Sequence, residues 1–103
     1  MFNKENRYIT KGINEMVDIR LQIFMWRVID GLKDKVEKVD YLQVFEIEKE
    51  YGTITINHRQ EVPKYNEEHI IELCDIEIEV VGKIKIFVID DGDHSTMLLA
   101  EEY

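Results

Sequence analysis

Apolar and charged residues alternate along much of the chain after residue 40, and this alternation constrains the fold more than any other feature. Residues 76–80 read Ile, Glu, Ile, Glu, Val, and residues 83–86 read Lys, Ile, Lys, Ile. A period of two residues is typical of a strand that buries one face and exposes the other. The pattern therefore predicts a largely antiparallel sheet in this part of the chain.

Turn residues divide the pattern into short strands. The expected strands cover residues 7–10, 41–50, 53–59, 76–80, 83–90 and 96–100. Tyr51-Gly52 and Val81-Gly82 are expected to be the turns of two hairpins, and in the second hairpin Glu side chains of one strand would face Lys side chains of the next. Pro63 is expected to end the third strand and to open a polar connection through residues 64–68, and residues 69–73 fit either a strand or one helical turn.

A helical period of apolar residues precedes most of the strands. Asp18 can cap a helix that runs to about Lys38, and Gly12 is expected to end the short strand before it. Six apolar side chains share one side of this helix: Leu21, Met25, Val28, Ile29, Leu32 and Val36. We therefore expect an α+β fold, in which one long amphipathic helix packs on a mostly antiparallel sheet of about five strands within a single domain, residues 1–103.

Two of the expected strands are apolar on both sides. Leu42 and Val44 lie on the side opposite Phe45, and Phe87 and Ile89 extend the apolar character of their strand to its second side. The start of the first strand is therefore expected to be covered on both faces, and the second is expected to be an interior strand.

Composition and charge restrict the class of protein. The apolar share is 45%, the charged share is 34% and the net charge is −9, as in a soluble globular protein. Residues 1–38 carry eight Lys and Arg against six Asp and Glu, while residues 39–103 carry five against sixteen. Such an acidic surface repels nucleic acid and anionic membranes and attracts basic proteins.

Neither a membrane span nor secretion is expected. The longest apolar run, residues 23–29, is interrupted by Arg27 and is far shorter than the roughly 20 residues that span a bilayer. The N-terminus lacks the apolar stretch of a secretory signal, and the single Cys74 fits a reducing compartment. We therefore expect a cytoplasmic protein.

Two apolar residues of the helix break its amphipathic pattern. Ile23 and Phe24 point toward the polar side, where they bracket Arg27, and Gly31 lies on the same outer line. Aromatic and Arg side chains are enriched in the cores of protein interfaces, so these four residues are candidate interface residues with Phe24 as the anchor. The alternative is that the N-terminal segment or a loop of the same chain covers them.

Candidate catalytic and metal-binding residues are few. Asp90, Asp91, Asp93 and His94 form the densest group of potential metal ligands, which would support a metal-dependent hydrolase. A hairpin turn requires the same residue types, and their spacing does not match a calcium-binding loop. His58 has the inward parity of its strand and is expected at the end of the core. Because the sequence has no motif specific for catalysis or for a cofactor, we assign neither a catalytic residue nor a cofactor.

Direct nucleic-acid binding through the N-terminal third is a second alternative, and it is disfavoured. The basic residues there are Arg7, Lys11, Arg20, Arg27, Lys33, Lys35 and Lys38. Acidic residues are interspersed among them, and Trp26 is expected to pack at the edge of the core rather than to stack on bases.

Four segments of the chain carry a family resemblance. They are FNKENRYITKGI (2–13), VDYLQVF (39–45), HRQEVPKY (58–65) and STMLLAEEY (95–103). Together they resemble the domain of unknown function 960, a family of small uncharacterised proteins of low-GC Gram-positive bacteria. The resemblance implies a bacterial cytoplasmic protein and supplies no catalytic residues. It directs attention to the mixed polar segment, in which His58, Arg59 and Tyr65 are further candidate interface residues, although Pro63 also accounts for the segment as a loop of set geometry.

These observations predict a small acidic cytoplasmic protein that acts as a non-catalytic protein-binding or regulatory module. The expected partner is another protein, for example a basic nucleic-acid-handling protein, and a homo-oligomer is a further candidate. The hydrolase at the Asp90–His94 turn and the N-terminal nucleic-acid binder stay open as alternatives.

Overall fold

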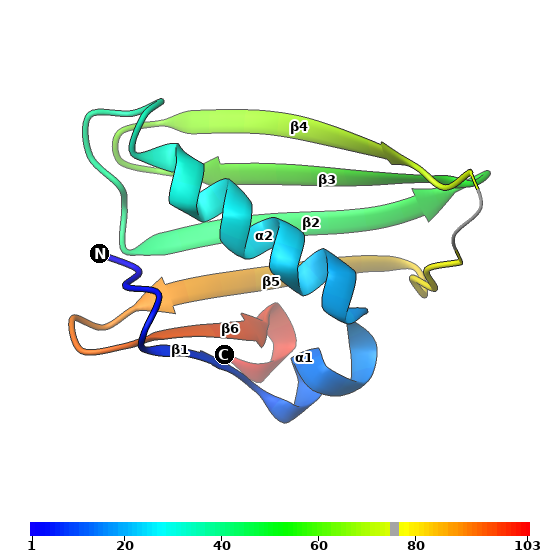
Figure 1. Cartoon of the computed structure of the whole chain (residues 1–103), viewed down its shortest axis with the longest axis horizontal. Coiled ribbons are helices and arrows are strands. Elements are labelled where there is room, and N and C mark those ends of the chain that lie inside the picture. Colours follow the sequence, from blue (N-terminus) through cyan, green and yellow to red (C-terminus); the bar gives the residue numbers. More distant parts are fainter. Residues whose placement is uncertain (75–76) are drawn as a thin grey trace.

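The computed structural model describes residues 1–74 and 77–103. Its elements are β1 (Arg7–Ile9), α1 (Lys11–Met16), α2 (Ile19–Leu32), β2 (Leu42–Glu50), β3 (Thr53–Gln60), β4 (Tyr65–Glu72), β5 (Lys83–Asp90), β6 (Ser95–Leu99) and the short 3-10 helix η1 (Ala100–Glu102). The described strands form one sheet in the order β1-β6-β5-β2-β3-β4, in which β1 and β6 are parallel and all other neighbours are antiparallel (Figure 1). The fold is α+β as predicted, with six strands rather than about five.

The central hairpin of β2 and β3 agrees with the sequence prediction. Tyr51 and Gly52 form its two-residue turn with φ angles of 49° and 76°. Positive φ at both turn residues is the type I′ geometry, whose twist matches that of the flanking strands. The turn sets the register, so that Phe45 lies opposite His58 and Ile47 opposite Ile56.

Strand β4 occupies residues for which the sequence predicts a polar connection. It pairs with β3 along its whole length, from Tyr65 opposite Gln60 to Glu72 opposite Thr53. The predicted connection is therefore wrong from Tyr65 onward, and residues 69–72 of the ambiguous segment 69–73 belong to the strand. As an edge strand, β4 is paired on one side only, so its outer residues stay in water and can be polar. Their polarity hides the strand from a search for apolar alternation.

The predicted hairpin between residues 76–80 and 83–90 does not form. Residues 77–80 are not in a strand, Ile76 lies outside the described residues, and β5 pairs with β2 instead. The Lys side chains of β5 consequently face the Glu side chains of β2. Alternation alone could not decide between the two pairings, because both candidate partners present Glu at every second position.

Helix α2 is shorter than predicted. Asp18 caps its start as expected and accepts a hydrogen bond from the backbone N–H of Arg20 at 2.8 Å, but the helix ends at Leu32 rather than Lys38. Residues 33–38 offer only one apolar side chain, Val36, so further helical turns would bury little surface. Gly12 does not end the first strand, since it lies in the short helix α1, which the sequence analysis did not predict.

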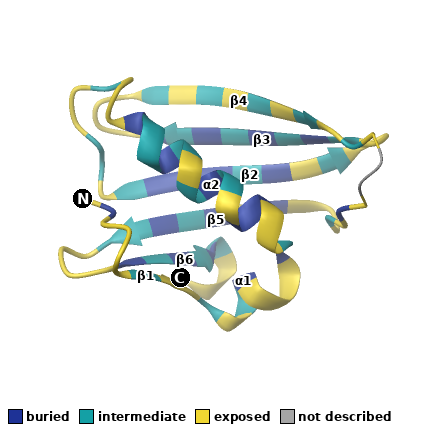
Figure 2. Cartoon of the chain, in the orientation of Figure 1, coloured by how far each residue is buried: buried dark blue, intermediate teal, exposed yellow. Residues whose placement is uncertain are grey.

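The core lies between the two helices and one face of the sheet, which we call the covered face. Its fully buried apolar residues are Ile13, Met25, Phe45, Ile47, Ile54, Ile56, Ile86, Val88 and Met97. Figure 2 shows the exposed side of α2 turned away from the buried strand residues beneath it. We call the opposite side, on which neither α1 nor α2 packs, the open face. No helix in the described part of the chain has both the length and the apolar character needed to cross a membrane.

Candidate protein-interaction surfaces

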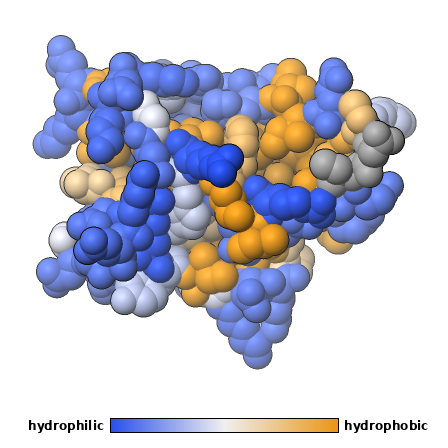
Figure 3. Space-filling view, in the orientation of Figure 1, coloured by the Kyte–Doolittle hydropathy of each residue, from blue (hydrophilic) through white to orange (hydrophobic). Residues whose placement is uncertain are grey.

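The outer side of α2 carries three of the predicted interface residues. Ile23, Arg27 and Gly31 follow one another at intervals of four residues, and the Ile23 residue is 45% exposed. A Cβ built on Gly31 would meet no atom within 4 Å, so this part of the helix is open to solvent. Figure 3 shows hydrophobic side chains over α2, between hydrophilic groups. This line on α2 is one candidate surface.

Phe24 does not belong to that surface. Its ring is half-buried against the core and meets His69 of β4 edge-on, with 5.4 Å between the ring centroids. The prediction that Phe24 points outward as an anchor is therefore wrong. The physical reason is β4, which extends the sheet beneath this side of the helix and gives the ring a partner within the chain.

His58 is fully buried, as its inward parity predicts, and cannot serve as the interface residue suggested by the resemblance. Its ring stacks on Phe45 with 4.4 Å between the centroids. Burial lowers the pKa of His58 from 6.5 to about 4, so the ring is neutral near pH 7. The side chain belongs to the core.

A chain of buried amides assigns the proton on the His58 ring. The Gln60 Nε2 donates to the carbonyl oxygens of Lys38 and Pro63, and its Oε1 accepts from Gln43 Nε2 at 2.9 Å. Gln43 Oε1 therefore faces His58 Nε2 at 2.6 Å, and this nitrogen must be the donor. The Nδ1 atom keeps a lone pair in the dry interior, with no hydrogen-bond partner among the described residues. It is a base without access to solvent, which suits a structural role and not proton transfer.

Tyr65 is half-buried on the covered side of β4 and belongs to a polar cluster with Glu67 and Lys35. The Tyr65 hydroxyl donates to the Glu67 carboxylate, and Lys35 Nζ lies 3.0 Å from Glu67 Oε2. Hydrogen bonds from Tyr65 and then Lys35 lower the pKa of Glu67. The cluster ties the segment after α2 to the edge strand, and it leaves the Tyr65 hydroxyl engaged within the chain.

Arg59 lies on the open face, on the side of the sheet opposite to His58 and Tyr65. Its Nη1 contacts Glu46 Oε1 at 2.9 Å, and Lys83 Nζ contacts Glu46 Oε2 at the same distance. Hydrogen bonds from Lys83 and then Arg59 lower the pKa of Glu46. The predicted interface residues are therefore divided between two faces and do not form one site.

The open face carries a second apolar cluster, which we call the open-face patch. It consists of Leu42, Val44, Phe87, Ile89 and Leu98. The strand register makes these side chains neighbours, because Ile89 lies opposite Leu42, and Phe87 lies opposite both Val44 and Leu98. Val44 is buried by the others, and the remaining four are half-buried. Tyr103 adds its ring at the edge, 5.6 Å from the Phe87 centroid.

The sequence signal for this patch was the apolar second side of β2 and β5. It predicts that the start of β2, with Leu42 and Val44, is covered on both faces and that β5 is an interior strand. The first prediction is wrong, since neither α1 nor α2 lies over Leu42, which is half-buried. The second is confirmed, since β5 lies between β6 and β2. The pattern identifies the residues correctly but cannot show whether the covering layer belongs to the same chain.

The Asp90–His94 turn uses its carboxylates to hold the turn itself. Asp90 Oδ1 accepts from the N–H of Gly92, while Asp91 Oδ1 accepts from the N–H groups of Asp93 and His94. Hydrogen bonds from these two backbone groups lower the pKa of Asp91. Within residues 1–74 and 77–103, no three His, Cys, Asp or Glu side chains are grouped so that they could hold a metal ion. The hydrolase alternative thus receives no support from the geometry.

The N-terminal basic residues are largely engaged with acidic groups. Arg7 pairs with Asp30 and places its guanidinium 4.7 Å from the Trp26 ring centroid, and Arg20 pairs with Asp18 at 2.7 Å. Trp26 packs against the core, as predicted. Among the aromatic residues of residues 1–38 only Tyr8 is strongly exposed, and acidic groups interrupt the basic ones, so the nucleic-acid alternative is not strengthened.

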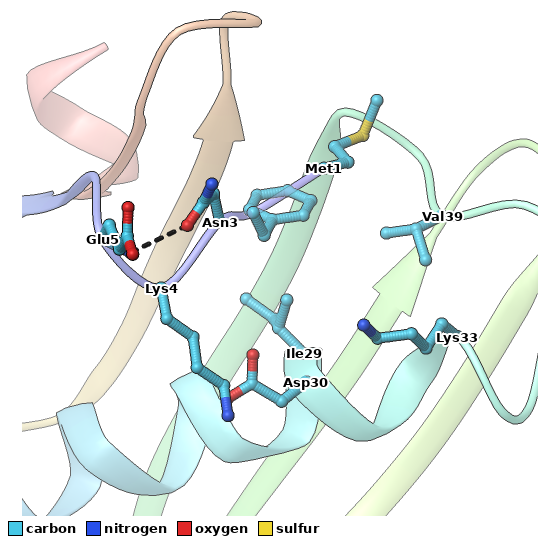
Figure 4. A pocket seen from close by; sticks show the side chains of 9 residues that line it. Met1, Asn3, Lys4, Glu5, Ile29, Asp30, Lys33 and Val39 are labelled. Carbon is cyan, nitrogen blue, oxygen red and sulfur yellow. Dashed lines mark hydrogen bonds and ion pairs between the residues drawn. The ribbon is translucent and has the colours of Figure 1, made fainter.

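A hollow of about 490 Å³ lies between the N-terminal residues and the end of α2 (Figure 4). Lys4 and Asp30 approach each other across it, with 4.0 Å between Nζ and Oδ2. Asp30 is also paired with Arg7, so its charge is already balanced. The hollow offers no group of side chains whose chemistry points to a ligand.

One solved structure resembles the chain along nearly its whole length. It is the crystal structure of a protein of unknown function from Enterococcus faecalis, with a TM-score of 0.75 and 25% sequence identity. The match covers 99% of this chain and 94% of the other chain. No curated protein matches the sequence.

A protein-family model agrees with the resemblance seen in the sequence. The model describes a staphylococcal protein of unknown function, DUF960, and it matches residues 6–102. The match includes both helices, all six described strands and every residue of the open-face patch. The chain therefore belongs to the DUF960 family, whose function is unknown.

Proposed function

We propose that this protein is a non-catalytic protein-binding module that binds through the open face of its sheet. The observation that supports the proposal is the open-face patch, in which five apolar side chains meet on adjacent strands under neither α1 nor α2. Charged side chains of the same strands border the patch, among them Glu46, Lys83 and Lys85. An apolar centre with a polar rim is the usual composition of a protein interface.

The outer side of α2 is the weaker candidate surface. Its strongly exposed apolar side chains are Ile19 and Ile23, which form a single row along the helix, whereas the open-face patch joins residues of three strands. Interface energy concentrates in clustered apolar and aromatic groups at the centre of a contact. We therefore assign binding to the open face and use α2 as the control surface.

The net charge of −9 favours a basic surface on a partner that is a different protein. We propose a protein with a basic surface, such as one that handles nucleic acid, because attraction between opposite charges speeds the encounter of the two proteins. Such a complex should weaken as ionic strength rises.

The test compares two matched variants as baits in nuclease-treated lysate of the host. Leu98→Asp places a charge in the open-face patch, and Ile23→Asp places the same charge on the outer side of α2. We expect proteins retained by the wild type to be retained by Ile23→Asp and lost by Leu98→Asp. Equal retention by all three would contradict the assignment of the open face. Circular dichroism verifies that each bait is folded, and Ile89→Thr is a milder second variant of the patch.

A further inference from the structure

We propose that the open face binds a second copy of this chain, and that the two copies form a symmetric dimer with the sheets face to face. The inference rests on the proposed function, since it names the occupant of the same surface. Its two-fold axis runs parallel to the strands, between β2 and β5. In a two-fold interface every contact occurs twice: if one residue of the first copy contacts a second residue of the other copy, the same two residues also meet with the copies exchanged.

The register of β2 and β5 makes this arrangement self-complementary. Across the strands the pairs are Leu42 with Ile89, Val44 with Phe87, Glu46 with Lys85 and Glu48 with Lys83. Rotation about the axis lays β5 of one copy over β2 of the other, so each of these pairs is repeated between the copies. At two positions along the strands, apolar side chains of one copy then meet apolar side chains of the other, and at two further positions Lys side chains meet Glu side chains. A shift of one copy along the strands would place an apolar or a like-charged group against a Glu or Lys.

The charged half of the face has groups free to make these contacts. Glu48 and Lys85 are exposed, and neither makes an ion pair with a group in residues 1–74 or 77–103. Glu46 and Lys83 already contact each other within the chain at 2.9 Å. Pairing between copies would therefore give Glu48 and Lys85 the opposite charges that they lack in the monomer.

The neighbouring strands fit the same arrangement. The axis places β6 of one copy over β3 of the other, so that Leu98 lies near Arg59 of the second copy. The guanidinium of Arg59 is held by Glu46, and its aliphatic stem is the part left to contact Leu98.

The face is large enough for a stable contact. The molecule extends 37 Å and 28 Å in the two directions across the sheet and 23 Å through it. A standard protein interface needs about 800 Å² from each partner. In sheets that pack face to face, the strands of the two sheets cross at an angle of up to about 30°. The alignment of β2 of one copy with β5 of the other is therefore best close to the two-fold axis.

The test uses two charge variants that repel themselves and attract each other. In Lys83→Glu, residue 83 meets Glu48 of the second copy, and in Glu48→Lys, residue 48 meets Lys83. We expect each variant alone to dimerise at least about tenfold more weakly than the wild type, as two repulsive pairs replace two attractive ones. In an equimolar mixture both pairs become attractive, and we expect a mixed dimer of near wild-type affinity. Sedimentation equilibrium of the purified full chain, from about 1 to 500 µM, measures all four samples.

A wild type that stays monomeric over this range would overturn the dimer. So would single variants that dimerise as well as the wild type, or a mixture that does not recover. Ile23→Asp is the control and should dimerise normally, because its side chain lies on the other side of the molecule. If the chain is monomeric but Leu98→Asp still loses a different protein in the lysate comparison, the proposed function stands and the dimer fails. If neither association depends on Leu98, both fail.

Discussion

The two faces of one sheet differ in how far their apolar side chains are buried. On the covered face, Phe45, Ile47 and Ile86 are excluded from solvent by the helices of the same chain. On the open face, Phe87 and Leu98 shield one another only in part, and the rest of the face carries charges. The same strands supply both sets at alternating positions. The covered face supplies stability, while apolar side chains of the open face remain half-buried, and this is the surface to which we assign binding.

Two consecutive residues of β3 show the same contrast. His58 points into the covered face, where burial keeps its ring neutral and lowers its pKa to about 4. Arg59 points into the open face, where its Nη1 contacts Glu46 at 2.9 Å. Neighbouring positions along one strand therefore place a ring in the core and an ion pair on the opposite face.

The largest difference between the faces is expected for two phenylalanines. Phe45→Ala removes a fully buried ring and should lower the free energy of unfolding by about 3–5 kcal/mol. Phe87→Ala removes a half-buried ring without leaving a closed cavity and should cost roughly 1–1.5 kcal/mol. Urea unfolding at low micromolar concentration measures both without a contribution from association. Equal losses would contradict the view that only one face is a core.

Low pH should lower the free energy of unfolding, because His58 on the covered face is buried in its neutral form. The pKa of this ring is 6.5 when unfolded and about 4 when folded, so the unfolded chain binds a proton more readily between these values. The contribution to stability is complete above pH 6.5, falls as the pH is lowered toward 4, and amounts to about 3 kcal/mol. His58→Gln should remove this part of the pH dependence, whereas His94→Gln, at an exposed position, should keep it. A pH profile unaltered by His58→Gln would refute the assignment.

Loss of the α2 cap should have a smaller effect on the covered face. Asp18→Ala removes the acceptor for the Arg20 N–H at 2.8 Å and should lower stability by about 1 kcal/mol. Asp18→Asn is the matched control and should retain most of the cap, because its amide oxygen can also accept this bond. Thermal unfolding followed by circular dichroism distinguishes the variants. No difference between Ala and Asn would argue against a cap at this position.

The smallest stability effect is expected on the open face. Glu46→Gln weakens the contacts with Arg59 and Lys83, and these partly exposed pairs should contribute only about 0.5–1 kcal/mol. The same change removes a negative charge that faces Lys85 of the second copy in the proposed dimer. We therefore expect a clear loss of association with little loss of stability. A large loss of stability with unchanged association would reverse the roles assigned to the two faces.

Local chemistry explains which parts of the fold could be predicted. The Tyr51-Gly52 turn fixes the β2–β3 hairpin, Asp18 marks the start of α2, and parity places His58 inside. Each of these signals depends on residues close together in sequence. The partner of β5 depends instead on a distant strand, and two segments of similar Glu-rich alternation competed for it.

The candidate site was harder to predict than the local elements of the fold, because the exposure of its residues depends on contacts between distant parts of the chain. The position of Phe24 on the polar side of the helix predicts an anchor, but its partner within the chain, His69, lies on β4, a strand that local alternation does not identify. Leu42 and Phe87 were correctly identified as apolar on the second side of their strands, but the pattern could not show that neither helix covers them. The residues of the patch were visible in the sequence, whereas their exposure required the fold.

Solvent access to methyl groups on the two faces, compared at low and high protein concentration, tests the role of the open face most directly. A soluble paramagnetic agent broadens the NMR signals of exposed methyls, and Leu98 and Ile89 can be compared with the buried Val88 and Met97. We expect the open-face methyls of Leu98 and Ile89 to be broadened in dilute samples and protected in concentrated ones, while Val88 and Met97 stay protected in both. Open-face methyls that are protected at every dilution, or broadened equally at every concentration, would contradict a face that is free in the monomer and buried between two copies.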